Sequence, residues 1–591
     1  MAGILLAGAP ILVLLFVART LWQYVAAFRK AAKLEKVTPI PVVRSYIPPQ
    51  TPILQLLEPY FSPWMLSLPY MLRHWYEYCG HTAAWSHKGR LPREELGSDV
   101  YWVVGLEGRR LYVQDPEVIY EITHRWRDFP KPKGYYSDLR LFGENVVTVE
   151  GSEWQYHRRI ITASFTEPTM NLVFVEAQRQ MASLIDKIGG RQFTPASVMS
   201  KLSTHMIAGS GFGQYMDWSG TDLPSSGSKG LQAHERGKPT TLASVVEAFG
   251  EHLLPMIVFP AWLLKSLPSP TMNMVGNSKE NFETLVRAMI QKIRDASQKE
   301  KDASPNAARK SDLLSNLVNA PSSVSGGTFS EQDIIGNVFA LSFAAEETTS
   351  SALQTGLILL AIHTDIQGAL QAEVDAICAN KAAGELMDYK TDWPKMRNLM
   401  AFMLEAQRTH PSFPALPKEA TTDQQITYRG HDIDIPAGTI ILYDMVAPHY
   451  DPRLWGPDAS AFRPSRWLMP SGYEAPPKSV NHCRDQRDML CPPRGAFVAF
   501  SEGYRNCLGK KFAQVGFCTL FATLLRTHSV ELVPHGDVAD ESEANWERTK
   551  GEAARRIENK TLVISMRISK DVMVRFVRRG TERFPPRAAK V

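Results

Sequence analysis

Apolar residues recur at helical spacing in two neighbouring segments of the chain, residues 334–343 and 353–362. This pattern is typical of one long helix that runs through a protein core. Between the two segments lie two acids and two threonines, residues 346–349. Acidic and hydroxyl side chains inside so apolar a helix cost free energy unless something uses them, so this insert is a candidate for chemistry.

An apolar stretch also opens the chain. Residues 2–28 carry a single charge, that of Arg19, and at about 1.5 Å per helical residue they span roughly 40 Å, enough to cross a bilayer. Three basic residues follow directly, and no acidic residue precedes Glu35. We therefore predict a transmembrane anchor over residues 1–30, with the rest of the chain on the cytosolic side. A cleavable signal peptide is the alternative, but the chain does not start with basic residues.

Four prolines, at positions 39, 41, 48 and 49, predict a stiff Pro-rich linker over residues 31–50, ahead of a folded domain over residues 51–591. An aromatic-rich stretch opens this domain with Tyr60, Phe61, Trp64, Tyr70, Trp75 and Tyr76. Such residues usually pack in a core, which we favour here, and contact with lipid headgroups is the alternative. Polar stretches predict surface loops at residues 219–241, 299–327 and 470–494.

Composition indicates a large globular enzyme. The chain has 591 residues, of which 44% are hydrophobic and 21% charged, so it can bury a substantial core. Its net charge of +5 is small for this length and gives no reason to expect nucleic acid as a partner. The six cysteines are few and widely scattered, which favours a reducing compartment over a disulfide framework.

The segment from Phe500 to Gly509 is the most informative about function. Two glycines, Gly503 and Gly509, bracket Cys507 and allow the backbone to turn tightly and approach a flat cofactor. Arg505 adds a fixed positive charge, suited to a carboxylate or to lowering the pKa of a thiol. Phe500 can pack beside the sulfur and tune a metal centre. Together these residues are typical of a thiolate loop that binds haem iron.

The pattern Phe-x-x-Gly-x-Arg-x-Cys-x-Gly resembles the haem-binding signature of the cytochrome P-450 superfamily, in particular its fungal microsomal members. The resemblance implies a mainly α fold with a minor β part, forming a single catalytic domain behind the N-terminal transmembrane helix. It also implies haem b (iron protoporphyrin IX), with Cys507 as the metal ligand.

The insert of the long predicted helix resembles the oxygen-activation motif of the same family. By this resemblance, Thr348 hydrogen-bonds the distal oxygen or its water, and Glu347 feeds protons from solvent. A threonine in a helix can also bond back to a carbonyl one turn earlier and open the helix locally. Ala345 stands where the family usually has glycine, so an extra methyl group narrows the predicted oxygen groove.

Glu405 and Arg408 are three residues apart and share one face of a predicted helix. Together with Arg466, in a segment that resembles the Pro-x-Arg segment of the family, they are expected to form a buried structural network. Trp154 and Arg158, one helical turn apart, resemble the Trp-x-x-x-Arg pair that reaches a haem propionate. Lys418 stands where the family more often has arginine and is expected to neutralise a propionate as a point charge.

The resemblance implies a monooxygenase that inserts one oxygen atom from O2 into a lipophilic substrate, in a fungal secondary-metabolite pathway. The chain after Cys507 has no glycine fingerprint for a flavin or nicotinamide, so electrons from NADPH are expected through a separate flavoprotein reductase. The expected location is the endoplasmic reticulum membrane, spanned once. Candidate substrate-lining residues are Tyr135, Phe142, Phe339, Phe343 and Phe413.

Two other functions stay open at this stage. One is a haem-thiolate enzyme that rearranges a peroxide, as an isomerase or dehydratase, without external electrons. Members of that kind generally lack the acid–threonine pair, so Glu347 and Thr348 disfavour it. The other is a non-catalytic haem protein that senses a gas, which has no use for a proton relay.

Overall fold

The computed structural model describes residues 18–19, 21–46, 52–106, 108–218, 242–303, 312–320, 323–324, 327–382, 384–469, 489–534, 542–562, 565–568 and 572–584. Within these ranges no helix combines the length and the apolar character needed to cross a bilayer. Residues 1–17, the larger part of the predicted anchor, lie outside the described residues, so the anchor stays a prediction.

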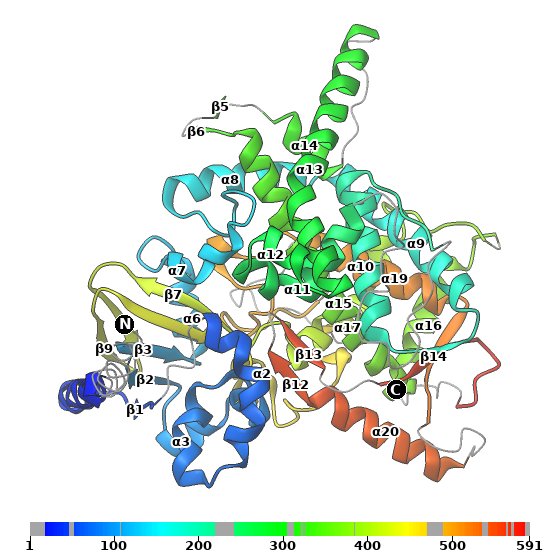
Figure 1. Ribbon diagram of the computed structural model, residues 1–591. Coiled ribbons are helices and arrows are strands. Elements are labelled where there is room, and N and C mark those ends of the chain that lie inside the picture. Colours follow the sequence, from blue (N-terminus) through cyan, green and yellow to red (C-terminus); the bar gives the residue numbers. More distant parts are fainter. Residues whose placement is uncertain are drawn as a thin grey trace, which may run out of the picture.

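The molecule is mainly helical, with a smaller β part at one side (Figure 1). Its helices are α2 (Pro52–Ser67), α3 (Tyr70–Cys79), α4 (His81–Ser86), α5 (Leu91–Leu96), α6 (Pro116–His124), α7 (Lys133–Tyr136), α8 (Gly151–Ser164), α9 (Glu167–Ile188), α10 (Pro195–Phe212), α11 (Leu242–Val258), α12 (Ala261–Ser266), α13 (Pro270–Ala303), α14 (Leu313–Val318), α15 (Glu331–Ile362), α16 (Thr364–Cys378), α17 (Arg397–Thr409), α18 (Pro452–Trp455), α19 (Lys510–Leu525) and α20 (Glu543–Glu558). Short 3-10 helices include η3 (Pro448–Tyr450), η4 (Pro464–Trp467) and η5 (Gly503–Arg505). This agrees with the mainly α, minor β character that the sequence predicts.

The largest sheet has five strands in the order β1-β2-β3-β10-β7. Strand β1 runs parallel to β2 and β3 parallel to β10, whereas the β2–β3 and β10–β7 pairs are antiparallel. The strands are β1 (Val42–Arg44), β2 (Val100–Gly105), β3 (Gly108–Val113), β4 (Gln192–Phe193), β5 (Ser323–Val324), β6 (Gly327–Thr328), β7 (Ala415–Ala420), β8 (Gln424–Tyr428), β9 (His431–Ile435), β10 (Thr439–Asp444), β11 (His528–Leu532), β12 (Lys560–Leu562), β13 (Met566–Ile568) and β14 (Val574–Arg578). The smaller sheets are β11-β14-β4, β12-β13, β5-β6 and β8-β9.

Helix α15 crosses the helical body and confirms the prediction of one long core helix. It begins at a capping box, in which the Ser330 hydroxyl accepts from the Asp333 amide while the Asp333 carboxylate accepts from the Ser330 amide. Glycine is required at position 336, because a Cβ there would lie 2.4 Å from the carbonyl oxygen of Glu144. This close approach fixes the loop before α8 against the central helix.

One sequence expectation about loops is corrected by the structure, and a second segment gains detail. Within the predicted linker over residues 31–50, a helix continues through residues 31–34 and β1 pairs with β2 in the main sheet, while the linker itself stays a prediction. The predicted loop over residues 299–327 contains the end of α13, all of α14 and the β5 strand. The other two predicted loops fall largely outside the described residues, at 219–241 and 470–488.

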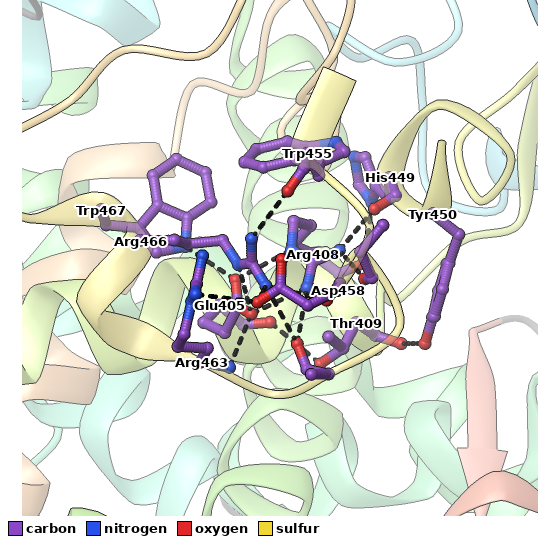
Figure 2. A network of polar contacts seen from close by, with 12 residues as sticks. Glu405, Arg408, Thr409, His449, Tyr450, Trp455, Asp458, Arg463, Arg466 and Trp467 are labelled. Carbon is purple, nitrogen blue, oxygen red and sulfur yellow. Dashed lines mark hydrogen bonds and ion pairs between the residues drawn. The ribbon is translucent and has the colours of Figure 1, made fainter. Parts of the chain in front are cut away.

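A buried charge network holds the chain that leads to the cysteine segment, and it brings together Glu405, Arg408 and Arg466 (Figure 2). Glu405 and Arg408, from α17, are both 0% exposed. The Arg408 guanidinium donates to both Glu405 carboxylate oxygens, at 2.7 and 2.8 Å. It also donates to three backbone carbonyls, those of His449, Ala459 and Ala461.

The Glu405 carboxylate also accepts hydrogen bonds from residues in and next to η4. Its carboxylate accepts from the Arg466 side chain at 2.9 Å, from the Arg463 amide at 2.8 Å and from the Trp467 indole at 2.9 Å. Each partner compensates part of the free energy that burying this carboxylate costs. The network therefore fixes the fold of residues 449–467 rather than taking part in chemistry.

His449 connects this network to the cysteine segment. Its Nδ1 lies 3.0 Å from the Arg408 carbonyl, and its Nε2 accepts from the Val498 amide at 3.0 Å. Burial, together with the charge of Arg408, lowers the pKa of His449 to about 3. The ring is therefore neutral at physiological pH, which leaves Nε2 free to accept from the chain just before Phe500.

Replacing Arg408 by lysine should destabilise the protein strongly. An ammonium group has three donors and no planar fork, so it cannot satisfy both Glu405 oxygens and three carbonyls at once. We expect a loss of about 3–5 kcal/mol in the free energy of unfolding, measured by urea denaturation.

The matched control is Arg463→Lys, whose side chain is 53% exposed and pairs with Asp458 at the surface. It should change stability by no more than about 0.5 kcal/mol. Equal effects of the two substitutions would contradict a special role for the buried guanidinium.

Candidate active site

Cys507 lies between η5 and the first turn of α19. Its amide donates to the Phe500 carbonyl at 2.9 Å, which closes the segment into a tight loop. The Cys507 residue has solvent-accessible surface. The many protein atoms around its sulfur nevertheless exclude much of the surrounding water, and this desolvation raises the pKa of the thiol. The amides of Gly509 and Lys510 act in the opposite direction, because N–H groups at a helix N-terminus stabilise a thiolate. The loop is therefore built to hold a sulfur anion once a metal compensates its burial.

Gly503 has a backbone role that is visible in the structure. Its φ is +69°, and a Cβ would lie 2.4 Å from the carbonyl oxygen of Thr123, at the end of α6. Glycine is needed here so that the loop can pack against α6. Its predicted contact with a cofactor stays a prediction.

The basic and aromatic residues predicted to meet a propionate lie side by side. The Arg505 guanidinium stacks 3.8 Å from the centre of the buried Trp154 ring and pairs with Glu150. Arg158, one turn further along α8, donates to the carbonyl and side chain of Asn506, at 3.1 and 2.6 Å. Arg505 thus lies two residues before Cys507 in the chain, and Arg158 hydrogen-bonds the residue directly before Cys507.

Two lysines, Lys131 and Lys418, lie near Arg505 and form a cluster of positive charge with it. The balance of charge in this cluster tests whether the carboxylates of haem fit the site. Burial and the charge of Arg505 lower the pKa of Lys418, on β7, to about 8. They also lower the pKa of Lys131 well below its usual range. Glu150 is the carboxylate that attracts both lysines in the part of the chain that the structure describes, so positive charge there exceeds negative charge. Two further Arg505 donors, Nε and Nη1, are buried with no hydrogen-bond partner among the described residues.

Haem carries two carboxylates, which match this excess of positive charge and the two free donors of Arg505. The residues present therefore fit the cofactor expected from the sequence. Lys131 and Glu150 were not predicted, because a lysine and a glutamate in separate loops carry no motif. Only their positions next to Arg505 in space identify them.

The middle of α15 has one open face in an otherwise buried helix. Ala344 is exposed and Thr348, one turn later, is half-buried, whereas most neighbouring residues on this helix are fully buried. The Thr348 hydroxyl donates to the Ala344 carbonyl at 2.8 Å, the back-bond expected from the sequence. The hydroxyl oxygen therefore keeps its lone pairs for a group in the open space.

Glu347 is buried and firmly held. Its carboxylate pairs with Arg567 on β13 and accepts from the Ser565 hydroxyl at 2.6 Å. The Arg567 side chain is 36% exposed, so it connects this carboxylate with solvent. The sequence pattern identified Glu347 but gave no signal for Arg567 or Ser565, which lie more than 200 residues further along the chain.

Glu346 is a second buried acid beside it that sequence reasoning passed over. One carboxyl oxygen accepts from Ser200 on α10 at 2.5 Å, and the other has no partner among the described residues. Burial and the nearby Glu347 raise the pKa of Glu346 to about 8. Glycine at position 250 of α11 makes room for it, because a Cβ there would lie 2.3 Å from its free oxygen. Glu346 is thus neutral at physiological pH.

Three of the five predicted substrate-lining residues pack in an aromatic cluster. Phe142 and Phe339 lie 5.2 Å apart, ring centre to ring centre, and Phe339 stacks on Phe343 at 6.1 Å. Phe249 and Phe282 complete the cluster from α11 and α13. All five rings are buried, so a substrate would have to displace some of them. Tyr135 is half-buried on α7, and Phe413 is half-buried against the core of the main sheet.

Glu346→Gln should stabilise the protein in a pH-dependent way. In the unfolded chain the carboxyl ionises near its usual pKa of 4.5, but in the folded protein it keeps its proton up to about pH 8. The stability that this group contributes is therefore greatest below pH 4.5 and falls as the pH rises to 8. Glutamine is neutral throughout, so its advantage should grow between pH 5 and pH 8, to on the order of 2–4 kcal/mol by urea denaturation.

The exposed Glu153→Gln variant serves as the control and should differ from the parent by no more than about 0.5 kcal/mol at any of these pH values. A constant difference between Glu346→Gln and the parent protein would show that the carboxyl is ionised in the folded state.

Comparisons with known proteins agree with this geometry. The sequence profile of the cytochrome P450 family matches residues 93–553. A cytochrome P450 monooxygenase of Arthrobotrys oligospora is 28% identical over 526 residues, which cover 82% of this chain and 84% of that protein. The monooxygenase prx9 of Penicillium rubens is 29% identical, with 76% and 78% covered.

A third relative, from Leptosphaeria maculans, is described as a monooxygenase of the phomenoic acid biosynthesis cluster; it is 28% identical, with 74% of this chain and 76% of that protein covered. Among solved structures, a cytochrome P450 (CYP102L1) superposes with a TM-score of 0.60 at 19% identity, covering 92% of this chain and all of that one. Because the family profile matches most of the chain, and the Cys507 loop, the cation cluster and the open face of α15 agree with it, the chain belongs to the cytochrome P450 family.

Proposed function

We propose that this cytochrome P450 monooxygenase is anchored in the endoplasmic reticulum membrane, with its catalytic domain in the cytosol, and oxidises a lipophilic intermediate of secondary metabolism. The observation that carries the enzymatic part is the cluster of Arg505, Lys418 and Lys131 beside Cys507, which has too little negative charge without a bound dicarboxylate. The relative described as belonging to the phomenoic acid biosynthesis cluster supports the metabolic part.

The protein groups have separate tasks at the haem site. Cys507 supplies the thiolate ligand, with the amides of Gly509 and Lys510 stabilising its charge. Arg505, Arg158 and Lys418 hold the carboxylates, and Trp154 supports the Arg505 guanidinium. Bound haem supplies the iron chemistry that activates O2 and transfers one of its oxygen atoms.

Thr348 and Glu347 handle protons on the α15 side. The Thr348 hydroxyl donates its proton to the Ala344 carbonyl, so its oxygen can accept a hydrogen bond from a water in the open space. Glu347 exchanges protons with solvent through water that enters beside the partly exposed Arg567, whose guanidinium stays charged and holds the carboxylate. A peroxide-rearranging enzyme needs no such supply of protons, so this arrangement favours the oxygenase.

Electrons come from a separate NADPH-dependent flavoprotein reductase in this proposal. Lys510 is exposed at the start of α19, where it can meet an acidic partner, whereas the neighbouring Lys511 pairs with Glu167. The substrate is expected to be mainly apolar, because it must take space now filled by phenylalanine rings.

Cys507→Ala should abolish the strongly red-shifted Soret band of the reduced carbon monoxide complex, because alanine offers no thiolate to the iron. The measurement is a difference spectrum of the purified protein. Cys378→Ala, at a half-buried cysteine on α16, should leave the band in place. A red-shifted band that survives in Cys507→Ala would place the ligand elsewhere.

Thr348→Ala should uncouple the reaction while haem binding persists. Without the hydroxyl, a water near the reacting oxygen loses the hydrogen bond that positions it. Hydrogen peroxide should therefore replace product while NADPH is still consumed. General acid–base help is typically worth about 10²–10⁴-fold, and we expect product per NADPH to fall at least about tenfold. Product and peroxide per NADPH are measured with reductase present.

Thr523→Ala is the matched control. Thr523 makes the same back-bond, to the Thr519 carbonyl at 2.8 Å, but lies in α19. Its replacement should leave coupling unchanged, and unchanged coupling in Thr348→Ala as well would exclude the proposed role of the α15 hydroxyl.

A further inference from the structure

Glu346 lies on the side of α15 opposite to the open face. It is two residues from both Ala344 and Thr348, and a helix turns about 100° per residue. Its carboxyl lies between α10 and α11, next to Ser200 and Gly250. Burying an acid costs free energy, and none of the tasks assigned to Thr348 and Glu347 uses this one. An apolar side chain would serve the packing of α10 against α15 better.

The hydrogen bonds of Glu346 indicate where its proton lies. The Ser200 hydroxyl donates to Oε1 at 2.5 Å, so this oxygen is an acceptor. Oε2 has no partner among the described residues. Burial and the charges of Glu347 and Glu247 raise the pKa of Glu346 to about 8, against the opposing charge of Arg567, so the carboxyl is neutral at physiological pH. Its proton is therefore on Oε2.

Ser200 connects this carboxyl with the outside of the protein. Ser200 is partly exposed on α10, whereas Glu346 is 1% exposed. After it has donated to Oε1, the Ser200 oxygen still has lone pairs with which it can accept from a water at the surface. A hydroxyl that accepts from water and donates to a carboxyl can pass a proton from the one to the other.

Gly250, on α11, is the place where Glu346 comes close to a partner of Glu347. A Cβ at position 250 would lie 2.3 Å from Oε2 of Glu346, so this oxygen points at the glycine backbone. The Gly250 carbonyl accepts from Arg567 at 3.0 Å, and the same guanidinium pairs with Glu347. The proton of Glu346 is thus directed at a point that Arg567 connects to the Glu347 carboxylate.

Glu347 needs a partner that carries a proton. Arg567 and Ser565 hold it as a carboxylate, which can accept a proton but has none to give. The Arg567 guanidinium stays charged and cannot act as the donor. Of the two neighbouring acids, Glu346 is therefore the one that has a proton to transfer at neutral pH.

We propose that Glu346 stores a proton and passes it to Glu347 past the Gly250 backbone, and that Ser200 replaces it from water on the α10 side. In this step Glu346 loses the proton on Oε2 while Glu347 gains one. Ser200 then gives its hydroxyl proton to Glu346 and takes one from water, so one proton moves inward and no electron moves. The route is separate from the water beside Arg567. The inference rests on the proposed function, because it assigns a proton source to the oxygenase reaction.

The first test is infrared spectroscopy of the full-length haem protein. A protonated carboxyl has a C=O stretching band separate from those of carboxylates, and the band that is lost in Glu346→Gln belongs to Glu346. On transfer into D2O this band moves to lower wavenumber as the proton is exchanged. Ser200→Ala should slow the exchange at least about tenfold, because the hydroxyl that connects the carboxyl with water is gone.

Ser203→Ala is the matched control. Ser203 lies on the same helix and donates to the backbone carbonyls of Ala345 and Glu346, at 3.2 and 3.3 Å, so it belongs to the same contact without touching the carboxyl. Its replacement should leave the exchange rate as it is in the parent protein. Equal exchange rates in Ser200→Ala and Ser203→Ala would overturn the proposed route, as would a Glu346→Gln spectrum that has lost no band.

The second test measures proton supply during turnover. With reductase and no added substrate, NADPH, one proton and O2 give NADP+ and hydrogen peroxide, so the reaction consumes protons at the site. In the parent protein the rate should fall as the pH rises through about 8, where Glu346 loses its stored proton. Glu346→Gln should be at least about tenfold slower at neutral pH and should lack this fall, because glutamine has no proton to transfer.

Two further variants separate proton transfer from packing. Glu346→Asp keeps an ionisable acid and should restore part of both the rate and its dependence on pH. The exposed Glu153→Gln should follow the parent protein at every pH, which shows that the fall does not come from the reductase. The red-shifted carbon monoxide band should persist in all variants, as expected of a folded haem domain.

The outcomes distinguish this inference from the proposed function. If Glu346→Gln oxidises NADPH at the parental rate and with the parental pH profile, the proton store is overturned and the oxygenase stands. If the parent protein oxidises no NADPH with reductase present, the proposed function is overturned, and the role of Glu346 in the reaction is overturned with it.

Discussion

The active site depends on the fully buried ion pair between Glu405 and Arg408. Neither side chain reaches solvent, so each needs every partner that the surrounding chain provides. That need orders residues 449–467, whose carbonyls and amides complete the pair. His449 accepts a hydrogen bond from the Val498 amide and so fixes the chain two residues before Phe500. The Phe500 carbonyl in turn accepts from the Cys507 amide and closes the loop. The cysteine is therefore held in place by charges that take no part in its chemistry.

The cation cluster is the opposite case, because its buried positive charges are only partly balanced by negative charges of the protein. Arg505 and Lys418 are buried with Glu150 as their nearby acid, and burial lowers the pKa of Lys418 to about 8. Such a cluster is unfavourable in the protein alone, so a dianionic ligand gains from entering it. Binding of the cofactor and stability of the fold are thus coupled at this point.

The parts of the site that the sequence predicts are those built from residues close together in the chain. Glu405 with Arg408, Trp154 with Arg158 and the residues around Cys507 each fall within one or two helical turns, so spacing alone relates them. Lys131, Glu150 and Arg567 come from distant loops and strands, and only the folded chain brings them to the site. The long helix α15 was predictable because its apolar pattern is strong and long.

The strand within the expected linker was not predictable for a related reason, because proline marks the end of a helix but cannot show that the residues after it, Val42–Arg44, pair with a strand about 60 residues further along. The aromatic stretch after it was expected mainly in the core. Half of that expectation holds, since Trp75 and Tyr76 are buried while Tyr60, Trp64 and Tyr70 are exposed. Periodicity predicts which residues share one face of a helix, but not whether that face contacts the protein core or the surroundings of the molecule.

The hairpin formed by β12 and β13 brings the C-terminal part of the chain to the central helix, where Arg567 and Ser565 hold Glu347. The two halves of the active site are therefore completed at different times during synthesis. A nascent chain that has passed α19 already contains Cys507 and the residues around it, but the acid on α15 still lacks its partners. A chain that ends before Ser565 would contain Cys507 but neither of the two residues that hold the Glu347 carboxylate.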